Sequence, residues 1–116
     1  MLIIYLMKAA LRLHSTLLNT TECSLAKSTL PTWNFVENKS VQKHFTFKDF
    51  KEAWEFMKLT AKVAEQHDHH PEWTNVFKRV EVRLTTHSAG GLTLKDVWLA
   101  KFMDQAESIV KHEHDE

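Results

Sequence analysis

Two adjoining stretches, VQKHFTF at residues 41–47 and DFKEAWEFMKLTAKVAEQ at residues 49–66, decide the fold of this chain. In the first, apolar and polar residues alternate, and this period of two is typical of a strand with one buried face. The second opens with Asp49 followed by Glu52, an N-terminal capping pair, and its apolar residues then recur at helical spacing. This spacing predicts a helix that buries an apolar stripe. The stripe consists of Phe50, Ala53, Trp54, Met57, Ala61 and Ala64.

Alternation on either side of this pair predicts further strands. Residues 33–36 form a short strand that ends in a hairpin turn at residues 37–40, and residues 76–86 form one longer strand. The longer strand turns its valines and Leu84 to the core, so we expect His87, just beyond its end, to lie on the opposite face.

A last helix is predicted after Gly90 and Gly91, where Thr93 and Asp96 form a capping box. Its apolar residues are Val97, Trp98, Phe102, Ala106, Ile109 and Val110. Strand pairs that alternate with single helices predict an α+β domain, in which an antiparallel sheet carries helices on one face. The other face is then free for an active site or a partner.

We expect a single folded domain over residues 29–111, because 116 residues suffice for one hydrophobic core. Residues 1–28 form an N-terminal extension, poorly ordered or used for targeting, and residues 112–116 form a polar tail. The apolar run at the start is too short to cross a membrane, and its positive charges follow it rather than precede it as in a secretory signal. The absence of acidic residues before Glu22 agrees with an organelle transit peptide. An upstream start codon is the alternative.

The composition restricts the classes of function. Lys and Arg together number 15, as do Asp and Glu, so no net field attracts nucleic acid or an anionic membrane. The single Cys23 excludes an internal disulfide and agrees with a reducing compartment. We therefore expect a cytoplasmic protein, with a nuclear or organellar pool as the alternative.

Histidines gather between the predicted helix and the long strand, in HDHHPEW at residues 67–73. Because Pro71 favours an extended conformation at His70, the helix has to end before it and the imidazoles project from a loop. The residues alone leave three interpretations open: a metal site, polar loop residues with capping roles, and acid–base catalysis. The chain has no paired cysteines or helical histidine spacing to favour metal. The other two stay equal.

A longer series of residues resembles the signature of the pterin-4a-carbinolamine dehydratases. The series is Phe45-Thr46-Phe47-Lys48-Asp49-Phe50, Glu65, His69-His70-Pro71-Glu72-Trp73, Phe77, His87 and Asp96, within a resemblance that covers residues 30–109. The resemblance implies a four-stranded antiparallel sheet covered by helices, self-association through sheet edges and helices into a homodimer or homotetramer, and a pterin pocket with neither metal nor other cofactor.

The resemblance also assigns roles to individual residues. It places catalysis on His69, His70 and His87, with Glu65 and Asp96 in supporting positions behind them. Ser88 departs from the acidic residue common in relatives, which puts a polar contact at this position in doubt. The full set expected to contact substrate is Asp68, His69, His70, Thr85, Thr86, His87 and Ser88.

The implied reaction is the dehydration of a 4a-hydroxytetrahydropterin to the quinonoid dihydropterin, in tetrahydrobiopterin recycling. One acid and one base suffice, and we assign these roles to His70 and His87, with His69 either orienting the substrate or substituting for one of the two. The alternative is a protein-interaction module, because some members of the family serve as dimerisation cofactors of a transcription factor. The expected partners are thus the pterin, further copies of the chain, and a hydroxylase or transcription factor, but neither nucleic acid nor a membrane.

Overall fold

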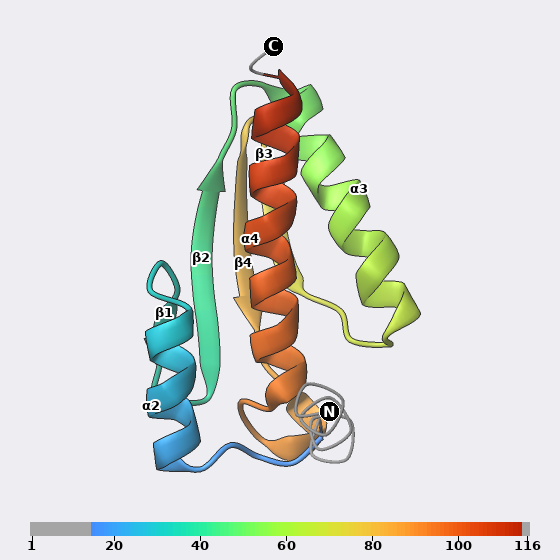
Figure 1. Cartoon of the computed structure of the whole chain (residues 1–116). Coiled ribbons are helices and arrows are strands. Elements are labelled where there is room, and N and C mark those ends of the chain that lie inside the picture. Colours follow the sequence, from blue (N-terminus) through green and yellow to red (C-terminus); the bar gives the residue numbers. More distant parts are fainter. Residues whose placement is uncertain (1–14, 115–116) are drawn as a thin grey trace, which may run out of the picture.

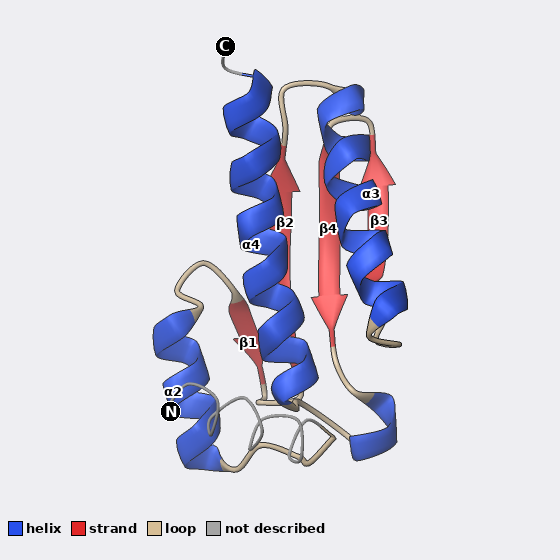
Figure 2. Cartoon of the chain, turned by 45° about the vertical axis from the view of Figure 1, so that its right-hand side comes forward, coloured by secondary structure: helices blue, strands red, loops and turns tan. Residues whose placement is uncertain are grey.

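The structure, a computed structural model, describes residues 15–114. Its strands form one antiparallel sheet in the order β1-β2-β4-β3, and its helices lie on one face of that sheet (Figures 1 and 2). This confirms the predicted α+β class and the four-stranded sheet. In chain order the elements are α2 (Thr20–Thr29), β1 (Asn34–Val36), β2 (Ser40–Thr46), α3 (Phe50–Gln66), β3 (Glu72–Val76), β4 (Arg79–Leu84), the 3-10 turn η1 (His87–Ala89) and α4 (Leu94–His114).

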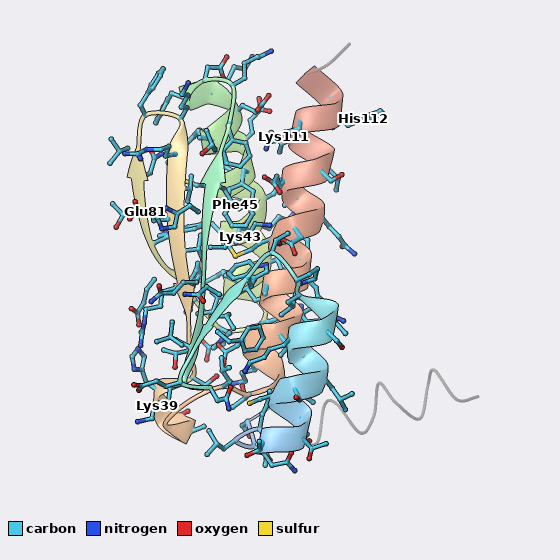
Figure 3. The ribbon with its side chains drawn as sticks, turned by 90° about the vertical axis from the view of Figure 1, so that its left-hand side faces the viewer. Lys39, Lys43, Phe45, Glu81, Lys111 and His112 are labelled. Carbon is cyan, nitrogen blue, oxygen red and sulfur yellow. The ribbon has the colours of Figure 1, made fainter. Side chains whose placement is uncertain are left out.

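The core lies between the helix-covered face of the sheet and helices α3 and α4. Phe45 of β2 is fully buried and packs against Phe56 of α3, with ring centroids 4.6 Å apart. Figure 3 shows Phe45 and Lys43 on the side of the sheet that faces α4, whereas Glu81 lies on the other side. Lys43 is tolerated there because its ammonium lies 2.7 Å from the carboxylate of Asp104 on α4.

The predicted strand over residues 76–86 is wrong in its first part, because the chain reverses at Phe77 and Lys78 between β3 and β4. Asn75 stabilises this turn by donating its side-chain N–H to the carbonyls of Phe77 and Arg79. The reversal pairs Val76 with Arg79 on the helix-free face, so Val76 is exposed while Val80 is buried. Val76 and Val80 are an even number of residues apart, so a period of two places them on one face, whereas the turn places them on opposite faces.

The two long helices begin where the capping residues predict, but the faces that they bury differ from expectation. Asp49 accepts from the backbone N–H of Glu52, and the carboxylate of Asp96 accepts from the backbone N–H of Thr93. However, Phe50 and Trp54 of α3 are exposed, and so are Trp98 and Ile109 of α4. Because aromatic residues occur on more than one side of each helix, helical spacing alone does not decide which side is buried. The predicted Ala53, Ala64, Ala106 and Val110 are buried, and the core of these helices also includes Phe56, Thr60, Leu99, Ala100 and Met103.

Folded structure begins before residue 29, which is the predicted start of the domain. Helix α2 opens with a capping box between Asn19 and Glu22, and buries Cys23 and Ala26. Leu18 also belongs to the buried core. The segment lacks a strong apolar stripe, so its burial depends on contacts with distant parts of the chain. Residues 1–14, on which the targeting prediction rests, and residues 115–116 of the expected tail lie outside the described residues.

Candidate active site

The histidine loop begins where α3 ends at Gln66. Asp68 adopts a left-handed φ of 51°, which Asp tolerates better than most residues. The backbone N–H of His69 then donates to the carbonyl of Ala64, and that of Asp68 donates to Glu65. These two bonds form a Schellman motif, which reverses the chain direction at the helix end. As a result, the His69 side chain reaches α4.

His69 is tied to the buried carboxylate of Asp96. Its Nε2 lies 2.7 Å from Asp96 Oδ1, and the two side chains are 11% and 0% exposed. The second oxygen, Oδ2, accepts from the hydroxyl of Thr86 at 2.7 Å and from the backbone N–H of Thr93 at 3.0 Å. The capping residue of α4 therefore also binds the histidine loop and the end of β4. Because a carboxylate only accepts, the proton on this contact belongs to His69 Nε2.

His87 is held in a different environment. It opens the short turn η1, and Gly90 with a φ of 79° lets the chain fold back, so that Thr86 and Gly91 pair. The His87 side chain is 79% exposed, and its Nε2 lies 2.7 Å from Glu72 Oε1. The same carboxylate accepts from Arg83 at 3.1 Å. The bond from His87, assisted by Arg83, holds the pKa of the Glu72 carboxyl below its ordinary value.

The remaining predicted residues vary in how firmly they are held. His70 Nε2 lies 3.6 Å from Glu65 Oε2, and both side chains are exposed. Ser88 is exposed within η1. The Thr85 hydroxyl donates to the carbonyl of Lys39, which leaves its oxygen as the group that a ligand can approach.

Two contacts thus join the loop after α3 to the segment at residues 85–88. His69 reaches Thr86 through Asp96, and Glu72 binds His87 directly. Glu72 was part of the signature series, but it was not among the residues predicted to have a role in the site. Its role follows from its pairing with Arg83 across β3 and β4. The single long strand predicted over residues 76–86 does not contain this pairing.

The site has no arrangement typical of a metal centre within residues 15–114, where no group of three or more His, Cys, Asp and Glu side chains could hold an ion. His67 is turned elsewhere, since its ring packs on Trp98 with centroids 4.3 Å apart.

Carboxylates orient the imidazoles of His69 and His87, each through Nε2, which suits proton transfer at the other ring nitrogen. In addition, none of the described helices combines the length and apolar content needed to span a bilayer.

The chain is similar to several known proteins. The model of the family described as "Pterin 4 alpha carbinolamine dehydratase" matches residues 16–106. A candidate pterin-4-alpha-carbinolamine dehydratase of Rhodopseudomonas palustris is 54% identical over 76 residues, which cover 65% of this chain and 75% of the relative. Its counterpart in Bordetella avium is 48% identical over 86 residues, which cover 73% of this chain and 80% of that protein.

A solved structure shares both fold and sequence. The crystal structure of a transcriptional coactivator/pterin dehydratase from Brucella melitensis superposes with a TM-score of 0.74 at 40% identity. The alignment covers 78% of this chain and 97% of the other. It therefore extends over nearly the whole of that protein.

Proposed function

Because the chain belongs to the pterin 4 alpha carbinolamine dehydratase family, we propose that it is a hydro-lyase that dehydrates a 4a-hydroxytetrahydropterin by histidine acid–base catalysis. The physiological setting of this proposal is tetrahydrobiopterin recycling in the cytoplasm. The observation that carries the catalytic part is the pairing of two predicted catalytic imidazoles, those of His69 and His87, with carboxylates at 2.7 Å.

The proposed reaction needs only proton transfers. An acid protonates the hydroxyl group on C4a, the C4a–O bond breaks, and water leaves. A base removes the proton from N5 as the C4a–N5 double bond forms, so that the product is the quinonoid dihydropterin. Neither substrate nor protein changes oxidation state in this reaction. We assign the acid and base roles to His70 and His87, and substrate orientation to His69.

The carboxylates support these roles by fixing the imidazoles. Glu72 accepts from Nε2 of His87 and Asp96 accepts from Nε2 of His69, so in each ring Nδ1 is the nitrogen left for substrate. A positioned acid or base typically contributes about 10²- to 10⁴-fold in rate. The substrate-binding roles proposed for Asp68, Thr85, Thr86 and Ser88 remain predictions from the family resemblance.

Stopped-flow absorbance tests the proposal. Freshly generated 4a-hydroxytetrahydropterin is followed as it decays to the quinonoid dihydropterin, with and without the full chain at neutral pH. We expect acceleration that survives prior treatment with a chelator. An unchanged decay with folded protein would refute the enzymatic proposal, and acceleration abolished by chelator would refute the metal-free mechanism.

A second candidate function is protein interaction, which one feature of α3 favours. Phe50 and Trp54 are 47% and 49% exposed and stack on each other with ring centroids 6.1 Å apart. Exposed aromatic pairs are typical of interaction surfaces. We propose that this pair contacts further copies of the chain in a homodimer or homotetramer, or alternatively a hydroxylase or transcription factor. The name of the Brucella protein, which includes coactivator activity, supports the second possibility.

Light scattering separates these partners. We expect the wild-type chain to have a mass of two or four times 13.6 kDa and Trp54→Glu to have a smaller one. As a control, Leu25→Glu changes an exposed apolar residue of α2. A wild-type monomer would leave the surface to a different protein, whereas an unchanged oligomer in Trp54→Glu would exclude the aromatic pair from self-association.

A further inference from the structure

The segment before α2 lies against the loop that carries His87. The backbone N–H of Leu18 donates to the carbonyl of Leu92 at 2.8 Å. The side chain of Leu17 covers Gly91 so closely that a methyl group on Gly91 would lie 2.9 Å from Leu17 Cδ1. Leu17 therefore contacts the end of the loop at residues 85–91 by its side chain, and Leu18 bonds Leu92, the next residue, by its backbone.

This segment is itself firmly anchored. Asn19 accepts from the backbone N–H of Glu22 at 2.8 Å, and Glu22 accepts from the backbone N–H of Asn19 at 2.9 Å. Leu18 precedes this capping box and is buried, as is Cys23 one turn into α2, in the positions of a hydrophobic staple. The capping box and staple fix the direction in which the chain enters α2, and with it the position of Leu17.

The loop also meets a second support, the turn between β1 and β2. The hydroxyl of Thr85 donates to the carbonyl of Lys39 at 2.7 Å. A methyl group on Gly91 would also lie 3.6 Å from the Cα of Lys39, an ordinary contact distance. The segment before α2 and this turn therefore both contact the loop at residues 85–91.

His87 depends on these supports because its own side chain has little packing. It is 79% exposed, and its bond to Glu72 is the side-chain contact that fixes the ring. A displacement of the loop would therefore move the imidazole relative to Glu72 and substrate. Misplacement of a catalytic group by about 1 Å can cost roughly 10²-fold in rate.

We propose that Leu17 is a positioning residue, which holds the loop at residues 85–91 so that His87 stays within reach of Glu72 and of the pterin. The expected effect on the rate rests on the proposed dehydratase function. The placement of the His87 ring, in contrast, can be measured without turnover. The Leu17 side chain is 51% exposed, so its removal leaves the buried core intact.

The test compares Leu17→Ala with Leu25→Ala, a matched control whose side chain is 63% exposed on α2. We expect Leu17→Ala to lower kcat by about 10-fold with little change in KM, since the loop moves while substrate contacts elsewhere remain. Leu17→Met, which keeps the contact with Gly91, should restore kcat. The imidazole signals of His87 in an NMR spectrum, assigned by their loss in His87→Ala, should shift in Leu17→Ala and stay in place in Leu25→Ala.

A second variant reaches the same contact from the loop. Gly91→Ala places its methyl group against the flexible end of Leu17, and should lower kcat and shift the His87 signals as Leu17→Ala does. The double variant should lose no more than either single one, because both act on one contact. Wild-type kcat and unshifted His87 signals in Leu17→Ala would overturn the positioning role. If the wild type itself fails to accelerate dehydration, the proposed function fails, and the His87 signals alone decide the positioning role.

Discussion

The His69–Asp96 pair and the His87–Glu72 pair have the same shortest distance between nitrogen and oxygen, 2.7 Å, in opposite environments. In the first pair the side chains are 11% and 0% exposed, and in the second they are 79% and 49% exposed. Burial makes the loss of one partner costly, because it leaves a charge in a medium that solvates it poorly. An exposed pair adds little stability, because water screens it.

One kind of contact therefore serves two purposes in this protein. Asp96 joins α4 to the histidine loop and, through Thr86, to the end of β4, so it holds the scaffold together. Glu72 orients a ring that is otherwise in water and is free to meet substrate. We therefore expect substitutions in the buried pair to change stability, and substitutions in the exposed pair to change rate.

The largest effect expected from breaking the exposed pair is on turnover. His87→Ala should lower the dehydration rate about 10²- to 10⁴-fold, equivalent to roughly 3–5 kcal/mol of barrier. Its free energy of unfolding should change by less than about 0.5 kcal/mol, as for other surface substitutions. Stopped-flow rates and urea unfolding measure the two quantities. His44→Ala is the control, because His44 is 70% exposed on the helix-free face. An unaltered rate would remove His87 from the mechanism.

The buried pair should respond in the opposite manner. Asp96→Asn should lower the free energy of unfolding by about 2–3 kcal/mol, because the amide cannot replace a carboxylate that accepts from His69, Thr86 and Thr93. Asp49→Asn is the matched control at the start of α3, where Asn and Asp are nearly equivalent caps. Equal losses in the two variants, measured by urea unfolding, would show that Asp96 acts only as a cap.

A smaller effect should follow when Glu72 loses its charge. Glu72→Gln should lower kcat by about 10-fold through poorer orientation of His87. Glu81→Gln is the control, since Glu81 also lies beside a histidine, but that histidine is His44, at 3.8 Å, and not His87. A Glu72→Gln enzyme with wild-type kcat would mean that η1 alone orients the imidazole.

The smallest effect concerns stability and pH. The folded-state pKa of Glu72 lies below its ordinary value of 4.5, so its contribution to stability is present above pH 4.5 and is lost as the pH falls through the lower folded value. Because the pair is exposed, the contribution should remain under about 1 kcal/mol. Urea unfolding of wild type and Glu72→Gln should differ more at pH 6 than at pH 3. A difference that grows on acidification would mean that the folded state raises the pKa of Glu72 rather than lowering it.

Much of the fold could be predicted because its signals are local. Strand β2 and helix α3 lie within one residue of the predicted stretches, and Asp49 caps α3 as its spacing with Glu52 suggests. The turn at Phe77 was missed because it contains neither glycine nor proline, although Val76 and Phe77 followed by Lys78 and Arg79 interrupt the alternation there. The exposure of Trp54 was also missed, because the docking of α3 on the sheet selects the buried side of the helix.

The candidate site, like the fold, could be predicted from the sequence only in part. The sequence by itself determined that histidines follow the end of α3 and that Asp96 caps the first turn of α4, because capping and helix termination depend on neighbours along the chain. Only the tertiary structure decided that Asp96 bonds His69 across 27 positions and that Glu72 bonds His87 across 15. Periodicity records which side of an element is buried. The pairing of side chains from different elements depends instead on strand register and helix docking, which the whole core sets together.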